Sequence, residues 1–205
     1  MTVSTSSLLM PLLPCHGRQQ RIGIFGGSFN PAHAAHRLVS LTALRRLKLD
    51  AVWWVVTPGN PLKDKRDLPS TDVRVAAAQR MAAHPKIHVI AIEERLGSSY
   101  TYDLIAYLKK RSSTARFVWI MGTDNLQGFH RWARWQDIAA TVPIAVIDRP
   151  GSTHHALRAP AALALSPFRL PESKASVLAV KSAPAFVVLH GPRSKLSSTA
   201  LRQRH

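Results

Sequence analysis

Short apolar segments and amphipathic segments alternate along most of the chain. The first apolar segment, Arg21 to Phe25, is followed at once by Gly26-Gly27, which is typical of a buried strand that ends in a tight loop. From Ala34 to Leu49, leucines recur at helical spacing while arginine and lysine fill other positions, and this pattern predicts a helix. The apolar run from Val52 to Thr57 then predicts a second buried strand.

The same alternation continues toward the end of the chain. Further helices are predicted from about Ser70 to Ala83 and from Thr101 to Lys110, and a further helical region over Asp124 to Ala140. Further strands are predicted at Ile87 to Ile90, Arg116 to Met121, Pro143 to Ile147 and Phe186 to Leu189. Between Arg149 and Pro184 the chain is rich in Pro, Ala and Ser without a clean period, which predicts a long irregular segment. A short helix is expected after the last strand. Strands that alternate with helices predict an α/β fold with a doubly wound, mostly parallel sheet and helices on both faces.

Length and composition fit one globular domain. The chain has 205 residues, of which 46% are hydrophobic and 19% charged. We expect a single domain over residues 21–205, preceded by a flexible N-terminal extension over residues 1–20. No apolar run reaches the roughly 18 residues that a membrane span needs. The single cysteine, Cys15, cannot form an internal disulfide, so the cytoplasm is the expected location.

The charge balance favours anionic ligands without choosing among them. Lysine and arginine total 28 against 11 aspartates and glutamates, a formal net charge of +17. Such an excess suits polyanions or phosphorylated small molecules, but it also fits a solvated basic surface with no dedicated partner. A nucleic-acid-binding protein is therefore an alternative, although it explains none of the motifs described next and is the less favoured interpretation.

The loop from Gly26 to His36 carries the clearest candidate chemistry. It lies where the first strand passes to the first helix, at the ligand-facing edge of a doubly wound sheet. Gly26 and Gly27 allow close backbone approach to a phosphate, helix N-terminal amides attract anions, and His33 and His36 share one face of the first turn. The loop lacks both the Walker ending and the Gly-x-Gly-x-x-Gly spacing. A metal site on the two histidines lacks a neighbouring cysteine or carboxylate to complete it.

Residues 27–36 resemble the signature Gly-x-Phe-x-Pro-x-His-x-Gly-His of the HxGH nucleotidyltransferases. Two positions depart from it: Ala35 replaces the usual glycine, where a methyl group would crowd an approaching phosphate, and Asn30 replaces the more frequent aspartate. Near the other end, residues 195–202 look like the family's Ile-Ser-Ser-Thr-x-Ile-Arg element. There the two serines can cap a helix whose amides face phosphates, and Arg202 adds a planar charged donor.

The resemblance implies a Rossmann-like nucleotidyltransferase fold and two groups of nucleotide-binding residues. The residues it implies for ATP are Gly26, Gly27, Ser28, Phe29, His33, His36, Ser197, Ser198 and Arg202. Of these, His33, His36 and Arg202 are the implied catalytic residues, because they would neutralise charge on the reacting phosphates.

Within this superfamily, residues from about 21 to 202 resemble the bacterial nicotinate-nucleotide adenylyltransferases. The resemblance implies that Lys63 faces the phosphate of a mononucleotide and that amides near Thr101 accept a nicotinate carboxylate. It also implies that Asp124 binds a ribose and that Trp132 stacks on the pyridine ring. Without the resemblance, two tryptophans at the helical spacing of Trp132 and Trp135 are more often core residues than ligand-binding residues.

The implied reaction transfers an adenylyl group from ATP to nicotinate mononucleotide, forming nicotinate adenine dinucleotide and pyrophosphate in NAD biosynthesis. The attacking phosphate is already an anion, so no general base is needed, and alignment and charge neutralisation supply the catalysis. Mg²⁺ is expected to bind through the ATP phosphates rather than in a site made by the protein alone. Nicotinamide mononucleotide and phosphopantetheine remain alternative acceptors. The sequence does not indicate an oligomeric state.

Overall fold

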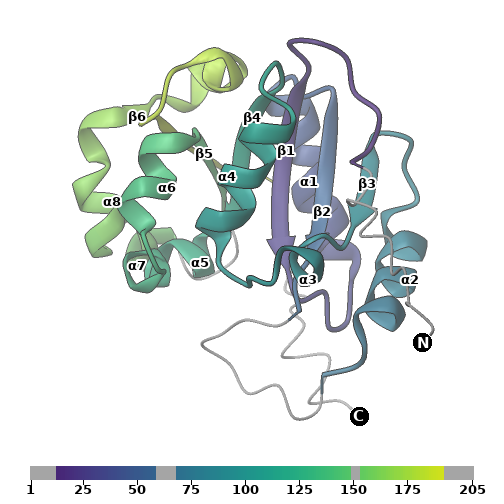
Figure 1. Ribbon diagram of the computed structural model, residues 1–205. Coiled ribbons are helices and arrows are strands. Elements are labelled where there is room, and N and C mark those ends of the chain that lie inside the picture. The colour runs from purple at the N-terminus through teal and green to yellow at the C-terminus, as the bar shows by residue number, and fades with distance from the viewer. Residues whose placement is uncertain (1–12, 59–67, 149–152, 192–205) are drawn as a thin grey trace, which may run out of the picture.

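The computed structural model describes residues 13–58, 68–148 and 153–191. Its centre is a sheet of seven strands in the order β3-β2-β1-β4-β5-β7-β6, and every registered pair is parallel (Figure 1). The strands are β1 (Arg21–Gly27), β2 (Ala51–Val56), β3 (Ile87–Ile90), β4 (Arg116–Gly122), β5 (Ile144–Ile147), β6 (Arg169–Leu170) and β7 (Phe186–Leu189). The predicted parallel α/β sheet is therefore confirmed.

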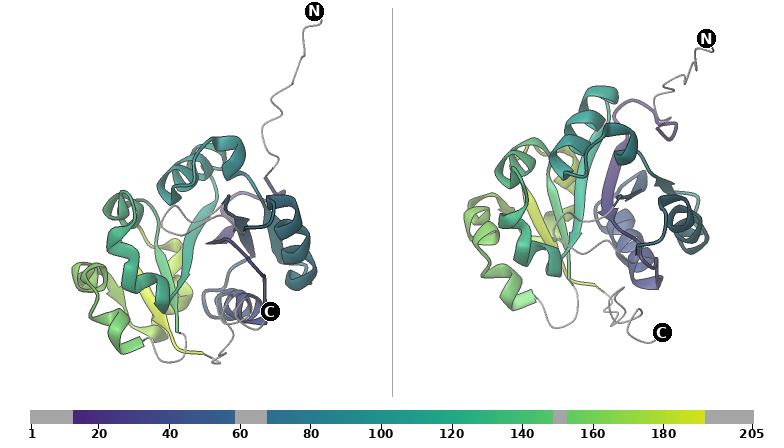
Figure 2. Two further views of the ribbon diagram at one scale, coloured as in Figure 1. Left: turned by 90° about the horizontal axis from the view of Figure 1, so that it is seen from below. Right: turned by 60° about the horizontal axis from the view of Figure 1, so that its bottom comes forward.

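Helices cover both faces of the sheet, as Figure 2 shows from two further directions. The α-helices are α1 (Ala34–Arg46), α2 (Thr71–Ala82), α3 (Glu93–Leu96), α4 (Thr101–Arg111), α5 (Thr123–Gly128), α6 (Trp135–Thr141), α7 (Thr153–Leu157) and α8 (Pro160–Ala164). The 3-10 helices are η1 (Phe129–Arg131), η2 (Ser166–Phe168) and η3 (Glu172–Val180).

Two hydrophobic cores lie on opposite faces of the sheet. One packs α4, α5, α6 and α8 against the strands, and the other packs α1, α2 and η3. Neighbouring side chains of β2 show the division, since Trp53 belongs to the first core and Trp54 to the second, with 1% and 0% exposed. Burial on both faces explains why the strands are continuous apolar runs.

The region predicted to be helical from Asp124 to Ala140 is helical over most of its length, and the structure divides it into α5, η1 and α6. The break lies at residues 132–134, where Arg134 adopts a left-handed conformation with φ of 56°. Its guanidinium carbon lies 3.5 Å from the centroid of the Tyr102 ring on α4. A contact between distant segments therefore favours the break over continued helix.

The irregular segment predicted between Arg149 and Pro184 is wrong over much of its length. It contains α7, α8, η2 and η3 together with β6, the edge strand of the sheet. Each element is short, and the two-residue β6 adds only a brief pairing with β7. Helices of three to five residues, such as α7, α8 and η2, are too short for the helical period to show in the sequence, and the nine residues of η3 are interrupted by a kink at Lys174.

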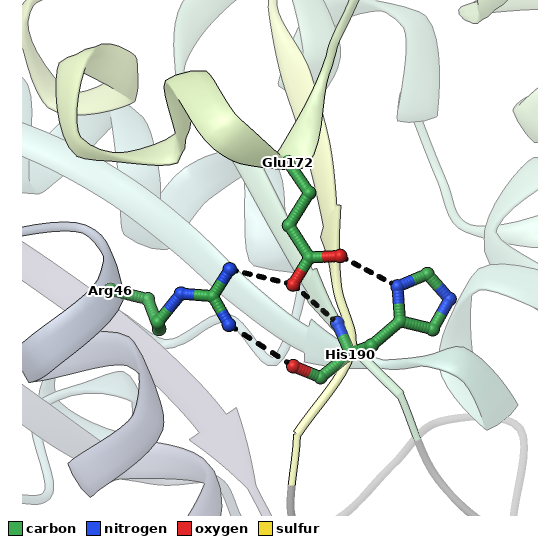
Figure 3. A network of polar contacts seen from close by, with 3 residues as sticks. All are labelled: Arg46, Glu172 and His190. Carbon is green, nitrogen blue, oxygen red and sulfur yellow. Dashed lines mark hydrogen bonds and ion pairs between the residues drawn. The ribbon is translucent and has the colours of Figure 1, made fainter.

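A polar network fastens this segment to the rest of the domain (Figure 3). Arg46, the last residue of α1, donates to Glu172 Oε1 at 2.7 Å and to the carbonyl oxygen of His190 at 3.2 Å. Glu172 also accepts bonds from the backbone N–H of His190 at 3.0 Å and contacts its Nδ1 at 2.7 Å. The start of η3, the end of α1 and the residue after β7 are thus held at one point.

The N-terminal boundary of the domain stays a prediction, and residues 1–12 lie outside the described part. Within the predicted extension, Leu13 packs against the first core and the His16 ring lies 5.6 Å from that of Trp53. Among the described residues, no helix is long and apolar enough to cross a bilayer.

Candidate active site

The order of the strands identifies one edge of the sheet as the candidate site. Strands β1, β2 and β3 extend to one side and β4, β5, β7 and β6 to the other, so the order reverses between β1 and β4. In open parallel sheets, ligands bind beyond the carboxyl ends of the strands at such a reversal. The loop that follows β1 and the turn into α5 that follows β4 flank this point.

The two histidines of the first loop lie together at the N-terminus of α1. His33 is the N-cap residue and is 3% exposed, while His36, one turn into the helix, is 8% exposed. Their ring centroids are 3.9 Å apart, and the backbone N–H of His33 donates to Nδ1 of His36 at 3.2 Å. Because Nδ1 of His36 is an acceptor, a neutral His36 carries its ring proton on Nε2.

Phe29 supports this histidine pair from within the protein. The ring is 1% exposed, stacks on Trp54 at 4.9 Å and 16°, and lies 4.9 Å from the ring of His36. Its φ of 46° is in the left-handed region, where a bulky residue is uncommon. Burial of its ring means that Phe29, predicted to bind ATP, can offer a ligand only its backbone.

Gly26 lies directly against a tryptophan of the neighbouring strand. A Cβ atom at this position would be 2.7 Å from the outer ring carbon Cη2 of Trp119, which is closer than carbon atoms pack. The Trp119 ring in turn meets the ring of Trp132 edge to face at 6.2 Å. The glycine is therefore required by packing within the protein, in addition to any need of a ligand.

The predicted mononucleotide residues that are described lie on three elements. Thr101 is the first residue of α4, half-buried, in a turn where Ser98 Oγ donates to the carboxylate of Asp103. Asp124 is exposed in the first turn of α5. Trp132 is half-buried after η1, with its ring 5.4 Å from that of Phe129 in an edge-to-face arrangement. Part of the Trp132 ring is therefore accessible.

Four predicted site residues lie outside the described part of the chain, namely Lys63, Ser197, Ser198 and Arg202. The predicted tight loop at Gly26-Gly27 is wrong, because the structure pairs both glycines with β2 as the last two residues of β1. Ser28, Phe29 and His33 lie in the loop that follows, His36 lies in the first turn of α1, and Asp124 follows the adjacent strand β4. Ala35, one of the two departures from the family signature, is 4% exposed in the first turn of α1.

No motif in the sequence marks Arg74 of α2, whose side chain is buried beside the loop that follows β1. It is 3% exposed and its guanidinium donates to the carbonyl oxygens of Ser28 and Thr57 at 2.8 and 2.6 Å. Its position in the helix could have indicated a buried role, because Arg74 lies at helical spacing from Thr71 and Ala78 on the buried face of α2. An arginine among buried positions indicates several backbone partners.

A second overlooked residue is Glu93, the first residue of α3. It is 2% exposed, and burial raises the pKa of its carboxyl group from 4.5 to about 7. Oε2 has no hydrogen-bond partner among the described residues. No sequence motif marked this glutamate, since it reads as an ordinary polar residue after β3.

Comparison with known proteins identifies relatives over nearly the whole chain. The family model described as cytidylyltransferase-like matches residues 24–204. A probable nicotinate-nucleotide adenylyltransferase of Agrobacterium fabrum is 56% identical over 184 residues, which cover 90% of this chain and 98% of that protein. One from Bradyrhizobium sp. (strain BTAi1) is 58% identical, covering 89% of this chain and 95% of that protein.

A solved structure shares the fold. The nicotinic acid mononucleotide adenylyltransferase of Plasmodium falciparum, complexed with NaAD, superposes with a TM-score of 0.68 at 19% sequence identity. The superposition covers 90% of this chain and 83% of that one. At this identity the likeness establishes the fold alone.

Proposed function

The chain belongs to the cytidylyltransferase-like family and, within it, to the nicotinate-nucleotide adenylyltransferases, and we propose that it transfers an adenylyl group from ATP to nicotinate mononucleotide. The products are nicotinate adenine dinucleotide and pyrophosphate, an intermediate and a by-product of NAD biosynthesis. The observation that carries the proposal is the histidine pair at the N-terminus of α1, beside the reversal of strand order.

ATP is proposed to bind along the loop after β1. The first-turn amides of α1 and the rings of His33 and His36 occur together there, and a helix N-terminus favours negative charge. Nε2 of His36 carries a proton whenever Nδ1 accepts the His33 amide, so this ring is set to donate to a phosphate oxygen. Ser197, Ser198 and Arg202 complete this part of the proposal by resemblance, since they lie outside the described residues.

The chemical step depends on alignment of the two reacting phosphates more than on a general acid or a general base. A 5′-phosphate oxygen of the mononucleotide attacks the α-phosphorus of ATP, and the bond from that phosphorus to the oxygen bridging toward the β-phosphorus breaks. The electron pair leaves with pyrophosphate, on which charge accumulates. Donors fixed in advance at those oxygens, proposed as His33, His36 and Arg202, stabilise that charge without reorganisation.

The acceptor is proposed to lie beyond the carboxyl end of β4, beside the N-terminus of α4. Asp124, in the first turn of α5 after β4, is assigned to the ribose, and the N-terminal turn of α4 at Thr101 to the nicotinate carboxylate. The half-buried ring of Trp132 is assigned to the pyridine. Lys63 is assigned to the 5′-phosphate by resemblance.

Mg²⁺ is proposed to accompany the ATP phosphates. Among the described residues, no group of three or more histidines, cysteines, aspartates or glutamates is gathered closely enough to hold a metal ion. The ion commonly relies on substrate phosphates in this way and would neutralise part of their charge. The cytoplasmic location also stays a prediction.

One assay tests the proposal and its alternatives. Purified protein is supplied with ATP, Mg²⁺ and one acceptor at a time, and pyrophosphate release and the dinucleotide product are measured. We expect the highest kcat/KM with nicotinate mononucleotide. A preference for nicotinamide mononucleotide or phosphopantetheine would refute the acceptor, whereas no pyrophosphate with any of them, together with salt-dependent RNA or DNA binding, would favour the nucleic-acid alternative.

A further inference from the structure

The loops that follow β1 and β2 diverge from a shared hydrogen bond. The backbone N–H of Thr57 donates to the carbonyl oxygen of Gly27 at 3.0 Å, which continues the pairing of β1 with β2 past its final registered pair, Gly27 and Val56. Beyond it, one loop continues to the histidine pair and the other toward Lys63. Under the proposed function, these two loops carry the two reacting phosphates.

Arg74 fills the space where the loops separate. Its Nη1 atom donates to both the Ser28 carbonyl at 2.8 Å and the Thr57 carbonyl at 2.6 Å, so one nitrogen bridges the two loops. Nε donates to the Pro69 carbonyl at 2.9 Å and Nη2 to Thr71 Oγ1 at 3.0 Å, which fixes the guanidinium to the start of α2. Nη1 therefore contacts the two loops, whereas Nε and Nη2 both contact the start of α2.

We propose that Arg74 is a positioning residue, which sets the distance between the ATP loop after β1 and the mononucleotide loop after β2 without touching either substrate. This inference rests on the proposed function. The guanidinium suits the role because its planar donors have fixed directions, and because a buried arginine with several carbonyl partners has little freedom to move. The bridging bonds from Nη1 set the separation of the loops, and those from Nε and Nη2 set the orientation of the bridge.

The bonds from Arg74 to the two loops and its bonds to the start of α2 have different consequences when they are lost. Methionine in place of Arg74 keeps much of the apolar stem but removes all four donated bonds. Lysine places three donors at a single nitrogen, which can still bridge Ser28 and Thr57 but cannot also reach both Pro69 and Thr71. Each loop retains its own substrate contacts in both variants, so the alignment of the two phosphates is what changes.

The experiment compares R74K, R74M and, as a control, R80M, which removes an exposed arginine from the same helix. Steady-state kcat and both KM values are measured well below each melting temperature, and ATP binding alone is measured by calorimetry. We expect R74M to lower kcat by about 10²-fold, the scale of a small misplacement of reacting groups. R74K should recover about 10-fold of that loss, and R80M should match the unaltered protein. The dissociation constant of ATP should change by less than about 5-fold in all three.

A purely structural role predicts another result, namely lower melting temperatures with an unchanged kcat per folded molecule. That result, or equal kcat in R74K and R74M, would overturn the inference. If R74M does not fold, the comparison of R74K with the unaltered protein decides, because a kcat within about 2-fold would contradict the role of the Pro69 and Thr71 bonds. Failure of the unaltered protein to form the dinucleotide would instead refute the proposed function.

Discussion

Replacing Glu93 by glutamine should stabilise the protein at alkaline pH and have little effect at acidic pH. The carboxyl group is 2% exposed at the start of α3, and its Oε2 has no partner among the described residues. Burial therefore disfavours the ionised form and raises the pKa from 4.5 to about 7. Glutamine has nearly the same shape but never ionises, so it removes the cost of burying a charge.

The sign and size follow from proton linkage. Between pH 4.5 and about 7 the folded state binds more protons at Glu93 than the unfolded state does, so the free energy of unfolding falls as pH rises through that window. Each pKa unit corresponds to about 1.4 kcal/mol, which makes the full cost about 3 kcal/mol above pH 7. At pH 5 the same relation gives less than about 1 kcal/mol.

Urea unfolding of both proteins at pH 5 and pH 8 measures this difference. In thermal unfolding, about 3 kcal/mol corresponds to a gain of about 6–12 °C at pH 8 for a domain of this size. An advantage for E93Q that is equal at both pH values would refute the reasoning, because it would show that ionisation of Glu93 contributes nothing.

Glu172 supplies a control, because its ionisation is expected to change the free energy of unfolding in the opposite direction to that of Glu93. Partial burial opposes its ionisation, but hydrogen bonds from His190 and Arg46 outweigh this and lower the pKa of the Glu172 carboxyl group. Its ionised form stabilises the fold above the unfolded pKa, and that contribution is lost as pH falls through the folded pKa. E172Q should therefore be destabilising at pH 8, where E93Q is stabilising.

Three further substitutions test the candidate site. H33A should lower kcat by about 10²-fold, the effect of losing one fixed donor to the transition state, and normal turnover would exclude His33 from catalysis. W132A should raise the KM for nicotinate mononucleotide while leaving the KM for ATP nearly unchanged, and equal changes in both would contradict the stacking role. G26A should destabilise the fold by about 1–3 kcal/mol in urea unfolding, because its Cβ would meet the Trp119 ring. Adding W119F, which removes the outer ring atoms, should restore part of that loss, and equal destabilisation in both backgrounds would show that the clash is elsewhere.

The fold was predictable where an element is long enough for its own hydrophobic pattern to show in the sequence. The strands β1, β2, β3, β4, β5 and β7 and the helices α1, α2 and α4 occur within a few residues of their predicted bounds. Their apolar runs and leucine spacings are local properties, and burial on both faces of the sheet reinforces them. The loop after β1 was recognisable for the same reason, although the glycine pair that marked it forms the last two residues of the strand.

The failures share a different cause, which is that a distant partner decides the local conformation. Within the predicted helical region, the break before α6 was not predictable, because there Arg134 lies over Tyr102, thirty-two positions earlier in the chain, and Trp132 and Trp135 both pack on Phe129. Trp132 and Trp135 are three positions apart, as in a helix, but Arg134 between them has a left-handed backbone conformation. Periodicity alone cannot show such a break.

Arg74 and Trp119 show that contacts between distant segments also limit how much of the candidate site can be predicted from the sequence. The residues that a motif names are those that contact a ligand, whereas the residues that hold the motif in place have partners on other segments. Arg74 bridges the loops after β1 and β2, and Trp119 of β4 packs on Gly26 of β1 and reaches Trp132. One tryptophan therefore connects the proposed ATP loop to the proposed pyridine-binding residue, and a change at Trp119 should move both KM values although the side chain belongs to neither motif.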